Sequence, residues 1–131
     1  MQPALFTFPG SPQAVVLNQD GSVNGPANPA RRGEFVTLYL TGSGPVLPAV
    51  RSGAPAPVAP LSRVAGLVEV EILGATVAED DLFFAGLTPG FVGLTQINVR
   101  IPADAFAGEQ VTLLLRIAGQ PTQPGTWLTI E

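Results

Sequence analysis

The residues of this chain that could do chemistry are carboxylates. Glu69 and Glu71 alternate with apolar residues in the segment LVEVEIL, so a strand over 67–73 places both carboxylates on one face. Strand geometry sets them about 7 Å apart, a spacing that could suit the acid pair of a glycosidase. The favoured interpretation is a solvated strand face, with Arg100 opposite the two carboxylates across the sheet.

A second acidic group consists of three consecutive residues, Glu79, Asp80 and Asp81. Carboxylate oxygens are the ligands that calcium prefers, and calcium sites are frequent on extracellular modules. These residues are therefore candidate calcium ligands, although the spacing of an EF-hand loop is missing. An exposed acidic turn without a metal is the favoured interpretation.

Three absences exclude most other catalytic sites. The 131 residues contain no His, no Cys and no Lys. Without His or Cys, the chain holds neither a Ser-His-Asp or Cys-His nucleophile nor a zinc site built from Cys and His. Without Lys, Schiff-base chemistry and the phosphate-binding Lys of a P-loop are excluded. The sequence therefore predicts a protein that is not an enzyme, with no catalytic residue and no cofactor other than calcium.

The elements that position these residues are predicted to be strands. The segment QINVRI at 96–101 alternates polar and branched apolar residues, which is typical of a half-buried strand. No segment keeps a period of 3.6 residues over three turns. We expect seven to eight mostly antiparallel strands, at residues 4–8, 13–17, 34–41, 67–73, 82–85, 96–101, 111–117 and 126–131.

Composition supports one all-β domain. The chain has 15 Gly and 14 Pro, and these fall mostly between the apolar runs, as turn residues do. Residues 42–61 form a long Gly/Pro-rich connection. Many short strands without helices predict an immunoglobulin-like β-sandwich over residues 1–131.

The phase of the strands predicts the core and the turns. Ile97, Val99, Leu113 and Leu115 share the inward phase, so we expect them to be buried and to face one another. Asp-Gly at Gly21 and Pro-Gly at Gly90 predict turns with positive φ at both glycines.

Trp127 is the first candidate for an interaction residue. If Leu128 and Ile130 face the core, Trp127 faces away from it, where an indole can stack on a sugar or on a partner protein. The alternative is that a loop, such as the connection 42–61, covers it.

Tyr39, Phe35 and Leu5 are the other interaction candidates. Tyr39 and Phe35 share the second apolar face of the strand at 34–41, and Leu5 lies in a first strand without charge. Exposed strand edges invite pairing with another chain, and charged edge residues usually prevent it. Because the first and last strands carry almost no charge, we expect dimers or larger assemblies through these edges or through an apolar face.

Charge and hydropathy exclude two classes of partner. The net charge is −4, and the six Arg are scattered, so no basic stripe exists for nucleic acid. No apolar run approaches the ~20 residues that insert across a membrane. Met1 and the residues after it lack the features of a signal peptide, as expected for a domain from the C-terminal end of a longer chain.

Three motifs together carry a resemblance to a known family. They are LNQDGS at 17–22, GSGP at 42–45, and the pair FAG and QINV at 84–86 and 96–99. Over nearly its whole length the chain resembles the Solibacter-type C-terminal domain family, found at the ends of large secreted or surface proteins of acidobacteria. The second half is also similar to immunoglobulin-like, plexin and transcription-factor-like repeats. Residues 74–81 depart from the family pattern, in which a Gly-Gly-x-Pro-Ala turn is common.

The resemblance implies a non-catalytic, extracellular or cell-surface module and carries over no catalytic residue. We therefore expect a structural or protein–protein interaction domain that contacts other domains of its parent bacterial protein or a second copy of itself. The alternative is a carbohydrate-binding module that accompanies a secreted hydrolase and binds polysaccharide through Trp127 and Tyr39.

Overall fold

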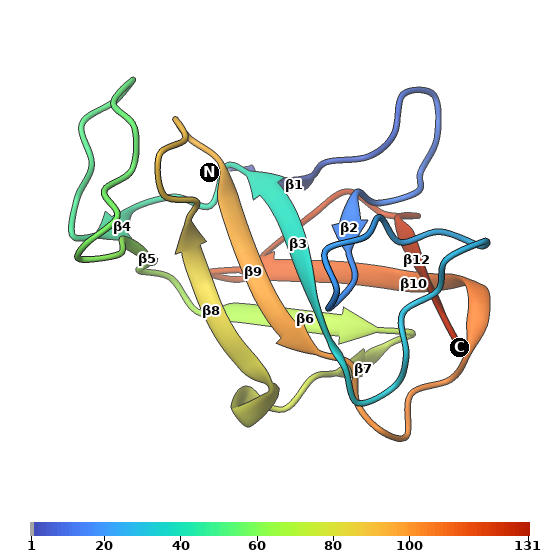
Figure 1. The fold of residues 1–131 in the computed structure, drawn as a ribbon. Helices are drawn as coiled ribbons and strands as arrows, with labels where there is room; N and C mark the ends of the chain where they lie inside the picture. Colours follow the sequence, from blue (N-terminus) through green and yellow to red (C-terminus); the bar gives the residue numbers. More distant parts are fainter. Residues whose placement is uncertain (1) are drawn as a thin grey trace.

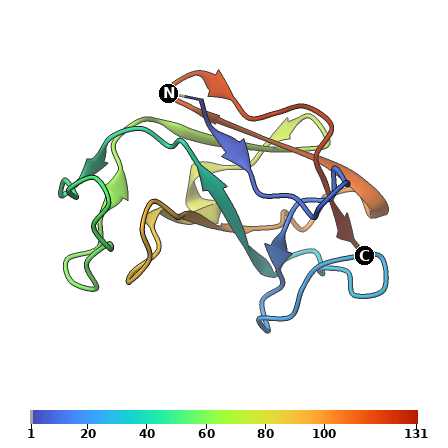
Figure 2. The same ribbon diagram turned by 90° about the horizontal axis from the view of Figure 1, so that it is seen from above.

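The fold is a sandwich of two β-sheets, seen in a computed structural model that describes residues 2–131; Met1 lies outside the described residues. Figures 1 and 2 show the two layers, with β3 (Phe35–Thr41), β9 (Thr95–Arg100) and β8 (Leu82–Leu87) crossing β6 (Val68–Ile72) and β10 (Gly108–Ile117). In the described chain the single helical element is a short 3-10 turn, η1 (Glu79–Asp81). The prediction of an all-β, immunoglobulin-like sandwich is confirmed.

The first sheet contains seven strands in residues 2–131, in the order β1-β3-β9-β8-β5-β4, with β2 also paired to β3. All of its ladders are antiparallel. The long strands β3, β9 and β8 form its centre, and the others are two residues long. The bounds are β1 (Ala4–Leu5), β2 (Val16–Leu17), β3 (Phe35–Thr41), β4 (Val46–Leu47), β5 (Arg63–Val64), β8 (Leu82–Leu87) and β9 (Thr95–Arg100).

The second sheet contains five strands in the same described range, in the order β11-β10-β6-β7, with β12 also paired to β10. The ten-residue strand β10 is the central strand of this sheet, because β6, β11 and β12 all pair with it. The bounds are β6 (Val68–Ile72), β7 (Ala75–Thr76), β10 (Gly108–Ile117), β11 (Gln120–Pro121) and β12 (Trp127–Ile130).

The core lies between the sheets and follows the period of two. Ile97 and Val99 of β9 and Leu113 and Leu115 of β10 are buried and belong to one apolar cluster, which confirms the core prediction. From β3 the same cluster takes every second residue: Val36, Leu38 and Leu40. Residues between these positions, such as those at 37 and 39, therefore face outward.

The last strand is not an edge, contrary to the prediction that it invites pairing. Its outer side is covered by three pieces of the N-terminal third. The Ala14 N–H donates to the Trp127 carbonyl at 2.9 Å, and the Ala30 N–H donates to the Thr129 carbonyl at 3.0 Å. Between these two backbone contacts, the side chain of Asn24 fills the gap.

The Asn24 amide replaces a strand at this point. Its Nδ2 donates to the Thr129 carbonyl at 2.8 Å, and its Oδ1 accepts from the Thr129 N–H at 2.8 Å. Asn24 is only 1% exposed, and its Nδ2 also donates to Oδ1 of Asn18. A buried backbone group without a partner costs free energy. The Asn24 amide therefore supplies the hydrogen bonds to the Thr129 N–H and carbonyl that a neighbouring strand would otherwise supply.

The first strand is protected in the same way. One side of β1 pairs with β3, and the Gln123 side chain occupies the other side. The Leu5 N–H donates to Gln123 Oε1 at 2.9 Å, and Gln123 Nε2 donates to the Leu5 carbonyl at 2.7 Å. The prediction of an open edge at Leu5 is therefore wrong, because a side-chain amide caps it.

The connection between β3 and β5 runs along the surface. It contributes β4, and the Ala56 N–H donates to the carbonyl of Phe91 at 2.9 Å. The backbone of the connection at Ala56 thus holds the turn that contains Gly90. Gly90 and Gly21 have φ of 82° and 85°, which confirms both turn predictions.

We predict that Leu115→Ala lowers the free energy of unfolding by about 2–5 kcal/mol, because it removes buried methyl groups and leaves a cavity. Urea denaturation followed by tryptophan fluorescence measures the change. Leu67→Ala is the matched control: Leu67 is 71% exposed, so its loss should stay within about 0.5 kcal/mol. Equal losses in the two variants would contradict the assignment of the core.

We predict that Asn24→Ala costs about 1–3 kcal/mol, because the Thr129 N–H is left buried without an acceptor. Asn28→Ala is the control, since the Asn28 amide bonds only exposed groups and its removal should cost less than about 1 kcal/mol. Hydrogen exchange adds a local readout: the Thr129 amide should lose protection in Asn24→Ala alone. Unchanged protection there would refute the role of the amide.

Candidate interaction surface

The two glutamates of β6 do not form an open acid pair. Glu71 makes an ion pair with Arg116, which lies on the neighbouring strand β10. Arg116 is also opposite Glu69 in the register. The expectation that Arg100 faces the two glutamates is wrong, because Arg100 lies on the other sheet, beside Phe83. The Arg116 guanidinium holds Glu71 as a structural partner.

The acidic residues Glu79, Asp80 and Asp81 form η1, which has no buried residue. In residues 2–131, no group of three or more acidic side chains gathers closely enough to hold a metal ion. The three candidate calcium ligands therefore follow one another in sequence without converging on one point.

Leu5 is 4% exposed and belongs to the core, so its prediction as an interaction residue is wrong. The error is one of phase. Both faces of the segment ALFTF carry apolar residues. Leu5, at the end of β1, is buried, and Phe6, which follows β1, is 42% exposed.

Trp127 is half-buried at the start of β12. The N-terminal segment runs beside it: Gln13 pairs with Trp127 in a parallel bridge, and the Trp127 N–H donates to the Pro12 carbonyl. The connection 42–61 does not cover it, since this connection packs on the turn at 89–91 and lies on the far side of the molecule in Figures 1 and 2. Trp127 and Tyr39 belong to different sheets and form no common platform.

The outer face of the seven-stranded sheet gathers most of the aromatic residues. Of one Trp, one Tyr and seven Phe in the chain, six lie on this face or at its end. Strand alternation places Phe35 and Tyr39 of β3 there, and the register sets Phe84 opposite the outward Asn98, because the inward positions of β3 and β9 are taken by the core. The six are Phe6, Phe35, Tyr39, Phe83, Phe84 and Phe91.

One end of this face is an apolar groove of about 400 Å³ around Tyr39. Phe6 and Phe91 flank it and are 42% and 57% exposed. Val15 and Leu94 complete the apolar lining. Thr88 also lines the groove, and its buried hydroxyl has no hydrogen-bond partner in the described residues. The groove is thus a mainly apolar hollow that contains one buried hydroxyl without a partner.

The other end is an aromatic and cationic cluster. Phe35 and Phe83 meet edge to face, with ring centroids 6.3 Å apart. The Arg100 guanidinium lies 5.1 Å from the centre of the Phe83 ring, a cation–π arrangement. Phe35 faces solvent in part, as predicted from its phase.

A short row of amides joins the two ends. Gln96 Nε2 donates to Asn98 Oδ1 at 3.0 Å, and Asn98 Nδ2 donates to Thr37 Oγ1 at 2.8 Å. These side chains are opposite Tyr39 and Thr37 in the β3–β9 register. Along the outer face of the seven-stranded sheet, the groove is therefore followed by the row of amides and then by the aromatic cluster. Reasoning from sequence found Tyr39 and Phe35 but missed the other four: Phe6, which follows the two-residue β1, Phe83 and Phe84 at the irregularity in β8, and Phe91 in the turn after Gly90.

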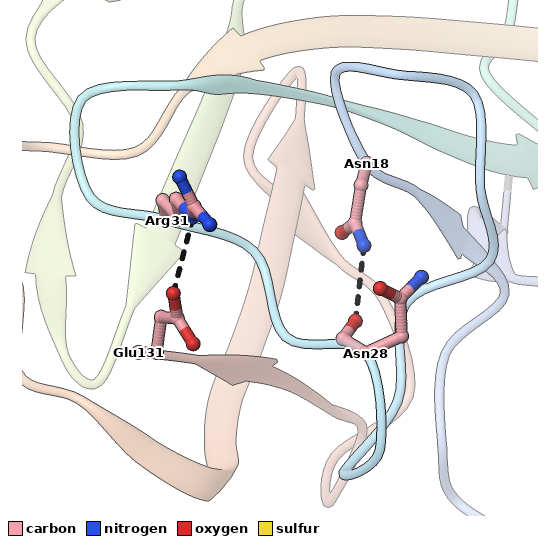
Figure 3. Close-up of polar contacts among 4 residues, drawn as sticks. All are labelled: Asn18, Asn28, Arg31 and Glu131. Carbon is pink, nitrogen blue, oxygen red and sulfur yellow. Dashed lines mark hydrogen bonds and ion pairs between the residues drawn. The ribbon is translucent and has the colours of Figure 1, made fainter.

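A polar hollow of about 320 Å³ lies beside the C-terminus, next to the start of β3. Figure 3 shows its main contacts: Arg31 Nε donates to Glu131 Oε1 at 3.1 Å, and Asn18 Nδ2 donates to the Asn28 carbonyl at 3.0 Å. In the same loop, hydrogen bonds from the Ser22 hydroxyl and N–H lower the pKa of Asp20. The polar groups around the hollow bond one another, and the contact of Arg31 with Glu131 joins the loop 18–34 to the end of the chain.

No helix within residues 2–131 has the length and apolar character needed to cross a bilayer. The chain matches no protein-family model, no curated protein and no solved structure.

We predict that calcium at about 1–10 mM, which exceeds the dissociation constants of about 0.1–1 mM of extracellular calcium modules, leaves the melting temperature unchanged. A ligand that binds only the folded state raises this temperature, and the carboxylates of η1 do not converge. Differential scanning fluorimetry with calcium against magnesium measures it. A rise of several degrees that is specific to calcium, and absent in Asp80→Asn, would overturn the prediction.

Proposed function

We propose that this domain is a non-catalytic interaction module that docks protein surfaces through the outer face of the seven-stranded sheet. The observation that carries the proposal is the concentration of aromatic side chains on that face, above all the groove between Phe6, Tyr39 and Phe91. Aromatic residues and Arg are enriched at the centres of protein interfaces, and exposed apolar patches mark binding sites.

The groove suits docking because its walls are held in place. The Phe6 N–H donates to the Tyr39 carbonyl at 3.0 Å, and the Phe91 carbonyl accepts from Ala56 at 2.9 Å. A backbone that is fixed in advance loses little conformational freedom on binding. The groove therefore offers an apolar contact whose backbone does not have to be ordered when a partner binds.

The setting proposed for this module is the terminal domain of a secreted or cell-surface bacterial protein. The resemblance of motifs such as LNQDGS at 17–22 to the Solibacter-type domains supports it. The partners are then other domains of the parent protein, or a second copy of the domain when those are absent. Since Asn24 and Gln123 close the terminal strands, association runs through the sheet face.

A second candidate function is polysaccharide binding. It is favoured by the position of the Gln96 and Asn98 amides beside Tyr39, because sugars are recognised by an aromatic ring together with hydrogen-bonding amides. Trp127, which lies on the other sheet, has no part in this site.

We predict that the domain self-associates at about 0.1–1 mM and that Phe91→Glu abolishes this, because a buried unpaired carboxylate disfavours the interface. Sedimentation velocity over a concentration series measures the association. Phe106→Glu is the matched control, since Phe106 is 73% exposed and lies outside the face, so it should behave like the parent chain.

Two results would contradict this proposal. One is a monomer throughout the series. The other is self-association that survives Phe91→Glu. Retention on insoluble polysaccharides that is lost in Tyr39→Ala would favour the second candidate instead.

A further inference from the structure

The residue whose amide closes β12 is followed by glycine. The chain contains four Asn, at positions 18, 24, 28 and 98, and only the one at 24 precedes a Gly. An Asn side chain can be attacked by the backbone nitrogen of the next residue. Gly in that place favours the attack, because it has no side chain and leaves the backbone free to bend. Asn28 precedes a proline, whose nitrogen carries no hydrogen to give up. Asn24 is therefore the side chain of this protein that is most prone to deamidation.

The reaction needs only water and turns the amide into an acid. The Gly25 nitrogen gives up its proton to the solvent and bonds to Cγ of Asn24. The bond between Cγ and Nδ2 breaks, Nδ2 takes up a proton, and ammonia leaves a cyclic succinimide behind. Water then opens one of the two ring carbonyls, which yields an aspartate or an isoaspartate in place of Asn24. No oxidant, reductant or other reactant takes part.

The folded structure restrains both partners of this reaction. The nucleophile is the nitrogen of Gly25, whose N–H donates to the Asn28 carbonyl at 3.2 Å. The leaving group is Nδ2 of Asn24, which donates to the Thr129 carbonyl at 2.8 Å and to Asn18 Oδ1 at 3.0 Å. Oδ1 of Asn24 accepts from the Thr129 N–H at 2.8 Å. Ring closure must break these bonds, so it requires that the loop first separate from β12.

The product cannot rebuild the contact. A carboxylate only accepts hydrogen bonds, so the oxygen that replaces Nδ2 would face two other acceptors, the Thr129 carbonyl and Asn18 Oδ1. Asn24 is 1% exposed, and the hydrogen bonds of its side chain go to neutral groups. The new charge would therefore be buried without an opposite charge, which costs free energy. An isoaspartate also lengthens the main chain by one carbon, which displaces the residues that follow.

We propose that Asn24 is a deamidation site of the opened chain, in which its hydrogen bonds to Thr129 are broken, and that its conversion makes the opening permanent. The folded domain protects the amide. A chain that stays open loses the amide and can no longer cover Leu128 and Ile130 of β12. Chemical change of the open state turns a reversible unfolding into an irreversible one. The inference concerns the closure of the last strand and does not depend on the docking face of the other sheet.

Peptide mass spectrometry tests where and when the reaction occurs. The domain is kept at mildly alkaline pH with and without urea, and conversion is followed by the mass difference between an amide and an acid. Fragmentation of the peptide that ends at Arg31 separates the three Asn within it. Isomerisation of Asp20, which also precedes Gly, leaves the mass unchanged. Conversion should occur at Asn24 and be at least about tenfold faster in urea, since in buffer only the small open fraction reacts. Equal rates, or conversion mainly at another Asn, would overturn the inference.

Gly25→Ala is the matched control for the consequence. A methyl group beside the nucleophile slows ring closure. The φ of Gly25 is not positive, and a Cβ there would lie 3.2 Å from Gln13 Nε2, the end of a flexible side chain, so the fold accommodates it. After a period in urea and dilution, the refolded fraction of the parent should fall as its deamidated fraction rises, whereas Gly25→Ala should still refold. Equal losses in both chains, or deamidated chains that refold and protect the Thr129 amide from hydrogen exchange, would contradict the proposal.

Asn24→Asp reproduces one product directly and does not depend on how Gly25→Ala folds. At neutral pH this variant should raise the unfolding equilibrium constant at least about thirtyfold over the parent, because it buries an unpaired carboxylate. Asn28→Asp is the control, since the Asn28 amide bonds exposed groups, and its effect should stay below about fivefold. Urea denaturation followed by tryptophan fluorescence measures both. Equal stability of the two variants would show that the acid is tolerated at the closure and would overturn the inference.

Discussion

The closure of β12 by the N-terminal third is the constraint on which the rest of the structure depends. The chain folds its first thirty residues back over the last strand, and the hydrogen bonds between the Asn24 amide and Thr129 join the two ends of the sequence. Without that closure, Leu128 and Ile130 would lie in an edge strand open to water. With it, they are fully inside the core, and β10 is supported along both of its sides.

The long strands could be predicted from sequence because each keeps one phase over six or more residues. β3, β9 and β10 bury alternate residues, and their core members follow from that period alone. The closure by Asn24 and Gln123 could not be predicted in this way. Each amide meets a backbone more than 100 residues away in the chain, and no local pattern distinguishes it from an amide in a turn.

The surface was partly predictable for a related reason. Tyr39 lies in a long strand whose phase is clear, so its outward direction follows from the sequence. Leu5 ends a strand of two residues and Phe6 directly follows it; both faces of this segment are apolar, and only the pairing of β1 with β3 decides which side is buried. Phe83 sits at an irregularity in the β8–β9 register, between Leu82 and Phe84, where the alternation that predicts direction is interrupted.

The same economy explains why one side of the molecule stays open. A chain without Lys cannot guard its edges with ammonium groups, and here amides and short return segments close the edges of β1 and β12. At β8, the short strand β5 covers the edge beside Gly86, and the chain then crosses to β6 in the other sheet. Because a chain that crosses between sheets cannot also run along the edge that it leaves, the crossover leaves a cleft between the two sheets, lined by Val64 and Val68.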